Sequence, residues 1–240
     1  MFYDYRPYVS VAERRKLAAK HAAKLAKKGR TVKPIQIEGR VIAHSFWGKA
    51  WCDNLESYSD YANRMPRGRT YARNGSIVDL HVAPGRVTAI VSGSDIYEID
   101  ITIEPLDGKL WKTLVRECTG RIGSLVELLR GQFSDDVMQV LARRKTGLFP
   151  SPEQISLGCS CPDWADMCKH VAAALYGVGA RLDAEPELFF TLRQVDQADL
   201  VGAATTRKPS RSRKAAGKRT VAAADLESVF GIELERPRRR

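Results

Sequence analysis

Apolar and polar residues alternate between residues 76 and 103, and this pattern predicts three short β-strands. The runs Ser76–Val82, Arg86–Val91 and Tyr97–Ile103 follow the period of two that is typical of half-buried strands. Pro84-Gly85 separates the first two runs and Gly93–Asp95 the last two, and both sequences favour turns. Because such short connections join antiparallel neighbours, the pattern predicts a small antiparallel β-meander.

Apolar residues that recur every three or four positions predict helices on both sides of the meander. In Phe46–Tyr61, Trp47, Trp51 and Leu55 recur at intervals of four. Two tryptophans on one helical face belong more often to a core than to a ligand platform. The other predicted helices are Val11–Lys28, Leu110–Cys118, Ile122–Leu129, Ser134–Ala142, Lys169–Leu182 and Pro186–Gln194.

The remaining segments predict loops and one further strand. Met65–Gly75 contains proline and glycine among its arginines, which predicts a basic loop. Gln154–Leu157 is a short strand candidate. From Gly202 onward Ala, Thr, Ser, Lys and Arg dominate, which predicts a disordered tail with one amphipathic segment at Ala224–Leu234. We therefore expect an α+β fold.

The net charge of +11 is concentrated at the two ends of the chain. Residues 1–33 carry ten Lys or Arg and two acids, and residues 203–220 carry seven Lys or Arg and no acid. Residues 34–202 hold 18 basic and 22 acidic residues, a net charge of −4. This distribution excludes a folded domain with a uniformly positive surface. It predicts that the flanking arms are the parts that contact polyanions.

Targeting signals and a disulfide framework are both missing from the sequence. No stretch approaches the ~18 apolar residues of a membrane span, and the first residues lack the apolar region of a signal peptide. Five cysteines, an odd number, argue against a disulfide framework. We therefore expect an untargeted protein in the cytoplasm.

Three cysteines and one histidine, Cys159, Cys161, Cys168 and His170, lie within twelve residues. Three thiolates and one imidazole are a common tetrahedral ligand set for zinc. We expect a strand to end near Pro162 and a helix to begin near Cys168, so that both pairs of ligands can reach one ion. The spacing predicts one structural Zn²⁺ per chain.

Three other interpretations of this cluster are open. Unrelated free thiols would be a poor explanation for four ligand-type residues so close together. A redox pair would need an exposed thiolate of low pKa with a resolving partner, and the usual C-x-x-C spacing is absent. A catalytic zinc needs an open coordination position, which four protein ligands would close.

The pattern Cys159-x-Cys161-x6-Cys168-x-His170 resembles the SWIM zinc finger, C-x-C-x(n)-C-x-H. The wider chain is similar to bacterial SWIM zinc finger family proteins over residues 35–202, with related segments at Arg67-Gly68-Arg69 and Cys161–Trp164. The resemblance implies zinc binding and a role in DNA or protein interaction. It also implies a bacterial protein that can associate with the nucleoid. A Swi/Snf-type helicase is the implied partner, because bacterial members are often encoded beside one.

The charge distribution and this resemblance together divide the chain into four predicted regions. Residues 1–33 form a basic helical N-terminal arm, and 34–146 form an α+β domain with the β-meander. Residues 147–202 contain a ββα-like SWIM zinc finger and the following helices. Residues 203–240 form a disordered basic tail.

Two basic segments are candidates for nucleic-acid contact. Between Tyr58 and Arg73, arginines alternate with tyrosines, and guanidinium groups can bind phosphate while rings stack on bases. A solvated loop with packed tyrosines is the competing interpretation. The second segment is the basic tail, which can contact phosphates without sequence preference. Its competing interpretation is that it serves only to solubilise the chain. The predicted contacts are Arg64, Arg67, Arg69, Tyr71, Arg73, Arg207, Lys208, Arg211, Arg213, Lys214, Lys218 and Arg219.

These features favour a non-catalytic, zinc-stabilised adaptor that binds DNA, a DNA-acting protein, or both. The first alternative is a protein-interaction module whose arms bind no nucleic acid. The second is an enzyme such as a nuclease. The sequence shows no carboxylate cluster, P-loop or G-x-G-x-x-G motif that would support it.

Overall fold

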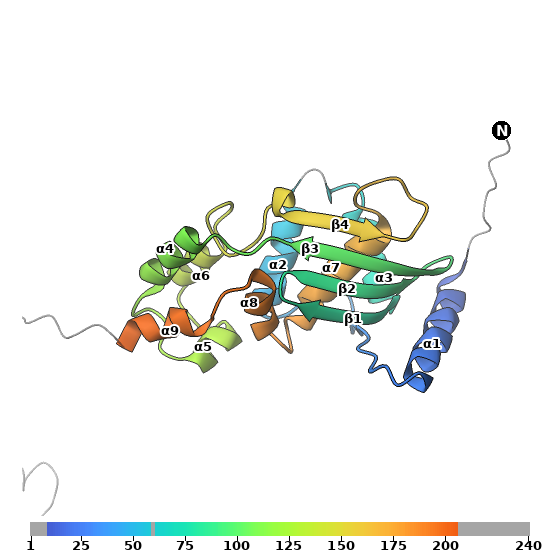
Figure 1. Ribbon diagram of the computed structural model, residues 1–240, viewed down its shortest axis with the longest axis horizontal. Coiled ribbons are helices and arrows are strands. Elements are labelled where there is room, and N and C mark those ends of the chain that lie inside the picture. The colour runs from blue at the N-terminus through green and yellow to red at the C-terminus, as the bar shows by residue number, and fades with distance from the viewer. Residues whose placement is uncertain (1–8, 59–60, 206–240) are drawn as a thin grey trace, which may run out of the picture. The chain divides into compact units, whose positions relative to one another are not determined.

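The computed structural model describes residues 9–58 and 61–205. A four-stranded antiparallel sheet has the order β1-β2-β3-β4, and helices pack on it (Figure 1). The strands are β1 (Ile77–Ala83), β2 (Arg86–Ser92), β3 (Ile96–Ile103) and β4 (Ile155–Cys159). The chain is therefore mixed α and β, and the predicted meander is confirmed and extended by a fourth strand.

Nine α-helices lie within the described residues. They are α1 (Val11–Lys27), α2 (Phe46–Glu56), α3 (Met65–Arg73), α4 (Gly108–Cys118), α5 (Leu125–Arg130), α6 (Asp135–Leu141), α7 (Lys169–Arg181), α8 (Glu187–Arg193) and α9 (Ala198–Thr205). No helix in this part of the chain is long and apolar enough to cross a membrane.

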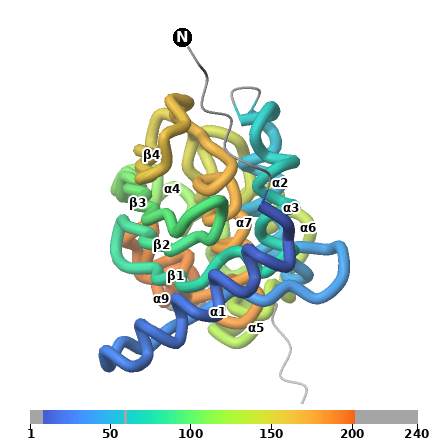
Figure 2. The backbone as a smooth tube through the Cα atoms, turned by 90° about the vertical axis from the view of Figure 1, so that its right-hand side faces the viewer, coloured from blue at the N-terminus to red at the C-terminus, as the bar shows by residue number. Residues whose placement is uncertain are grey.

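Helix α7 is the centre of the core. It contacts all four strands on one face of the sheet, and α2 and α3 pack on its other sides (Figures 1 and 2). The inner sheet face presents Ile99, Ile101 and Ile103 of β3, all 2 % exposed or less. Ten consecutive residues of α7, 170–179, are buried. Strand β4 and α7 therefore share one core with the preceding meander.

The two tryptophans of α2 lie in this core, as their spacing predicts. Trp47 and Trp51 are fully buried. Their indole N–H groups donate to the carbonyls of Leu128 and Leu175 at 3.0 and 2.8 Å. Because each buried N–H has an acceptor, the rings add apolar contact without an unpaired polar group.

Helix α1 covers part of the opposite sheet face (Figure 2). Ala18 forms a small second cluster with Val78 and Ile90, and Ala22 and Leu25 pack against it. The pairing of β1 with β2 shifts between Ile77 and Asp79. This irregularity lets Ile77 and Leu80, which are three residues apart, both join the main core while Val78 faces α1, so the strict alternation expected for β1 is broken.

Three expectations for the helices differ from the structure. Met65–Gly75 is not a loop, because α3 begins with proline in its first turn, where the missing N–H costs nothing. Helix α2 ends at Glu56, before Tyr61. Helix α9 continues to Thr205 beyond the expected start of the tail. The rest of that tail, including Ala224–Leu234, lies outside the described residues.

Small residues allow α7 to pack closely against α2 and α3. A Cβ atom added to Gly68 of α3 would lie 2.4 Å from the Cβ of Ala172. A Cβ on Gly48 of α2 would lie 2.5 Å from the carbonyl oxygen of Gly179. Both distances are too short for real contacts, so these glycines set the separation between the helices.

Gly68→Ala should lower the free energy of unfolding by about 1–3 kcal/mol, because the added methyl group forces the α3 and α7 backbones apart. Urea denaturation followed by circular dichroism measures this change. Gly108→Ala is the matched control, since a Cβ there has no neighbour within 4 Å. Equal losses in the two variants would contradict the close-packing explanation.

Candidate metal centre

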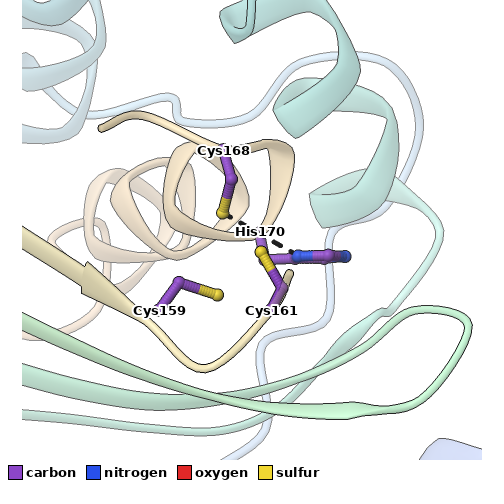
Figure 3. A group of neighbouring side chains, drawn as sticks. All are labelled: Cys159, Cys161, Cys168 and His170. Carbon is purple, nitrogen blue, oxygen red and sulfur yellow. Dashed lines mark hydrogen bonds between the residues drawn. The ribbon is translucent and has the colours of Figure 1, made fainter. Parts of the chain in front are cut away.

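The four clustered residues come from the end of β4 and the beginning of α7 (Figure 3). Cys159 pairs with Ile99 of β3, whose side chain belongs to the main core. Ser160 holds the chain against β3 beyond this point, since its backbone N–H donates to the Glu98 carbonyl at 3.0 Å. Because residues two apart on an extended chain share a face, Cys159 and Cys161 both point toward α7.

The other pair is placed by the first turn of α7. Cys168 is the N-cap residue, and its sulfur accepts a hydrogen bond from the backbone N–H of Val171 at 3.4 Å. His170 follows within the first turn. A helix N-terminus favours a negatively charged cap, so this position suits a thiolate.

The ligand atoms of Cys159, Cys161, Cys168 and His170 all lie within 4.8 Å of one another. The Cys168 sulfur and the His170 Nδ1 are 3.8 Å apart (Figure 3). Two ligands of one tetrahedral zinc, with bonds of roughly 2.3 Å to sulfur and 2.0 Å to nitrogen, are separated by roughly 3.5 Å. The cluster therefore has the dimensions of a four-ligand metal site, as the sequence spacing predicts.

The imidazole of His170 is held by its neighbours and is only 3 % exposed. It stacks on Tyr97 with ring centroids 4.3 Å apart, and Tyr71 approaches it edge-on at 5.4 Å. A Cβ on Gly93 would lie 2.7 Å from His170 Nε2. The ring therefore cannot shift toward the β2–β3 turn, and its Nδ1 faces the cysteines.

The pKa values of the three clustered thiols are shifted in different directions. The hydrogen bond from Cys159 lowers the pKa of Cys168 to about 3, against the opposing effect of burial. The same bond raises the pKa of Cys159, and burial raises the pKa of Cys161. Cys168, at the helix N-terminus, is therefore the thiol whose deprotonated form the cluster favours most.

A divalent cation fits this donor set. All five cysteines of the chain are free thiols, and the three in the cluster are not joined to one another. A bound cation deprotonates the thiols that coordinate it, so it would hold all three as thiolates. Zinc suits three sulfur ligands and one imidazole, whereas calcium and magnesium prefer oxygen.

The loop between the two pairs, Pro162–Met167, is named the metal loop here. The Asp163 carboxylate accepts from the backbone N–H of Ala165 at 3.2 Å and forms an ion pair with Arg64 at 3.5 Å. Met167 is buried, with 5 % of its surface exposed. Trp164 at the tip is 93 % exposed. The loop is therefore fixed at its ends and at Asp163, with one indole in solvent.

The predicted nucleic-acid residues of the middle region lie on or beside α3. Arg69 has partners inside the fold, because it pairs with Glu56 and lies 3.3 Å from the Tyr176 hydroxyl. These contacts, above all the one with Glu56, raise the pKa of the Arg69 guanidinium above its usual value. Arg64 is half-buried and paired with Asp163. Each of these two guanidinium groups therefore already has an acidic partner.

The other three have no acidic partner in the described residues. Tyr71 lies beneath two cations, with the Arg14 guanidinium 4.4 Å and the Lys169 ammonium 5.6 Å from its ring centroid. Arg67 is exposed and Arg73 is half-buried. The predicted contacts Arg207, Lys208, Arg211, Arg213, Lys214, Lys218 and Arg219 lie outside the described residues.

Tyr58 and Tyr61 are packed rather than presented to solvent, with exposed fractions of 9 % and 6 %. The competing interpretation, that the tyrosines of this region pack on the domain, therefore holds for both. Sequence reasoning missed Gly93 and Tyr97 as supports of His170. Gly93 resembles any turn glycine, and only the three-dimensional contact with the imidazole distinguishes it.

Comparison with known proteins gives one relative of unassigned function. The chain is 35 % identical over 163 residues to "Uncharacterized protein Rv2102" of Mycobacterium tuberculosis, and the match covers 67 % of this chain and 58 % of that protein. The chain therefore spans less than two thirds of the relative's length. No family model matches the chain, and no solved structure matches it.

Gly93→Ala should weaken zinc binding by about 10-fold or more, because the new methyl group displaces the His170 imidazole that it contacts. The φ angle of Gly93 is not positive, so alanine at this position is unfavourable only because its methyl group meets the neighbouring side chains. Competition with a chromophoric zinc chelator measures the affinity. An unchanged affinity, equal to that of Gly108→Ala, would show that Gly93 does not position the ligand.

Proposed function

We propose that this chain is a zinc-binding, non-catalytic adaptor of the SWIM type that links nucleic acid to a protein partner. The observation that carries the proposal is the four-ligand cluster, whose ligand atoms all lie within 4.8 Å of one another. Zinc bound there would supply folding energy by joining the end of β4 to the start of α7. Four protein ligands leave no open coordination position, which supports a structural rather than catalytic metal.

A row of lysines on α1 supports nucleic-acid binding. Lys16, Lys20, Lys24 and Lys27 are all exposed, and their spacing of three or four places them on one side of the helix. The opposite side of α1, with Ala18, is packed on the sheet. A docked helix with its cations in solvent presents them at fixed spacing to a phosphate backbone. The basic tail of residues 203–220 would add further contacts.

The protein partner in this proposal is a Swi/Snf-type helicase. Residues 34–202 carry a net charge of −4, so most of the folded region is better suited to contact a protein than a polyanion. The SWIM resemblance supplies the identity of the partner class. A partner that binds equally well after nuclease treatment, together with a chain that binds no DNA, would favour the pure protein-interaction module instead.

Purified protein should contain one zinc per chain, and Cys161→Ser or His170→Ala should reduce zinc content and the free energy of unfolding together. Inductively coupled plasma mass spectrometry and urea denaturation measure the two quantities. Cys118→Ala is the control, since this buried thiol lies outside the cluster and its loss should leave zinc content at one. A fully folded wild-type chain without zinc would refute the proposal.

Lys20→Gln with Lys24→Gln should reduce the slope of log K against log salt for duplex DNA by about 2, because each lost phosphate contact removes about 0.9. Fluorescence anisotropy of a labelled duplex at several salt concentrations measures the slope. Lys109→Gln with Lys112→Gln on α4 is the charge-matched control, since both lysines are exposed. Equal slopes for the two double variants would remove α1 from the DNA-binding surface.

A further inference from the structure

Trp164 is the most solvent-exposed large apolar side chain in the described residues. Its exposed fraction is 93 %, whereas the other three tryptophans, Trp47, Trp51 and Trp111, are at most 8 % exposed. A single large aromatic ring in solvent adds nothing to the core. Such rings are typical anchors of protein interfaces, where an indole fills a pocket or stacks on a cation.

The indole is attached to an ordered loop rather than to a mobile tail. The metal loop joins Cys161 to Cys168, so both of its ends are at the candidate metal centre. Asp163 fixes the middle through Ala165 and Arg64, and Met167 is buried. Because the backbone beside Trp164 is already ordered, a partner would lose little entropy by docking there.

The metal loop carries one acidic side chain without an ion pair, two residues from the indole, whereas the ammonium of the following Lys169 lies 5.6 Å from the Tyr71 ring centroid. Asp166 is exposed and forms no ion pair with any residue that the structure describes. Asp163 is balanced by Arg64. Three thiolates around one divalent cation would add a net charge near −1 beside the loop. An acidic neighbourhood repels phosphate and attracts ammonium or guanidinium groups.

We propose that Trp164 and Asp166 form a docking point for a lysine- or arginine-bearing segment of a protein partner. The cation would lie over the indole face, the strongest ring for this interaction, while Asp166 pairs with its charge. The proposal rests on the proposed function, because the zinc-filled cluster orders the loop and adds to its charge. It assigns the protein contact to the metal loop and leaves nucleic acid to α1 and the tail.

Fluorescence quenching tests the charge at the indole. Trp164 dominates quenching by ionic quenchers because the other three tryptophans are buried. Each quenching constant is divided by that of N-acetyltryptophanamide in the same buffer, because iodide is intrinsically the stronger quencher of indole. The normalised constant should be larger for caesium than for iodide in the zinc-loaded full-length protein, and Asp166→Asn should reduce that difference. A larger normalised constant for iodide would overturn the proposal, since it would show a positive environment.

Binding of two synthetic probes tests the occupant. Labelled nona-arginine should bind Trp164→Ala about 5-fold or more weakly than the wild type, and Asp166→Asn should also weaken it. Val126→Ala is the control, since Val126 is an exposed apolar residue on α5 and its loss should change nothing. Nona-thymidylate should bind wild type and Trp164→Ala equally.

Two outcomes would overturn the inference. One is nona-arginine binding that does not depend on Trp164. The other is nona-thymidylate binding that does depend on Trp164, which would make the loop a base-stacking surface. Zinc content measured on the same samples separates this failure from that of the proposed function. Wild type with one zinc and no Trp164-dependent peptide binding refutes only the docking point, whereas folded wild type without zinc refutes the proposed function.

Discussion

The close packing of α7 is the constraint on which the rest of the structure depends. This helix lies between the sheet and helices α2 and α3, and its ten buried residues include three alanines and two glycines, whose small size allows close packing. The same packing fixes where α7 begins. Since Cys168 caps that end and His170 is in its first turn, the position of half the candidate metal centre is determined by the core rather than by the metal loop.

Much of this arrangement was predictable from short-range patterns. The meander, the helices that flank it and the Cys₃His cluster follow from period, turn residues and ligand spacing. The prediction of a loop at Met65–Gly75 is wrong, because proline and glycine within a short segment favour a loop by local pattern alone. Pro66 instead starts the helix, and Gly68 is needed where α3 meets α7. Contacts between distant segments, such as Gly93 against His170, leave no local pattern and could not be predicted.

The structure also changes the meaning of the basic residues. A count of charges treats all arginines alike, but three of them have partners within the fold. Arg69 forms an ion pair with Glu56, and Arg64 forms one with Asp163. Arg14 is buried over the ring of Tyr71. These three cations hold α1, α3 and the metal loop in place. On the solvent side of α1, by contrast, Lys16, Lys20, Lys24 and Lys27 stay exposed and form a row along a helix that the sequence marks as basic.

The docking of α1 has a thermodynamic consequence. Its contact with the outer sheet face is small, consisting mainly of Ala18, Ala22 and Leu25 against Val78, Ile90 and Ile96. A helix of this length is only marginally stable by itself in water. Any polyanion that binds the lysine row in its helical spacing must therefore also favour the docked helix over the detached one, by linkage. The docking of α1 on the sheet would then become more stable as the ligand concentration rises, although the ligand itself binds on the other side of the helix.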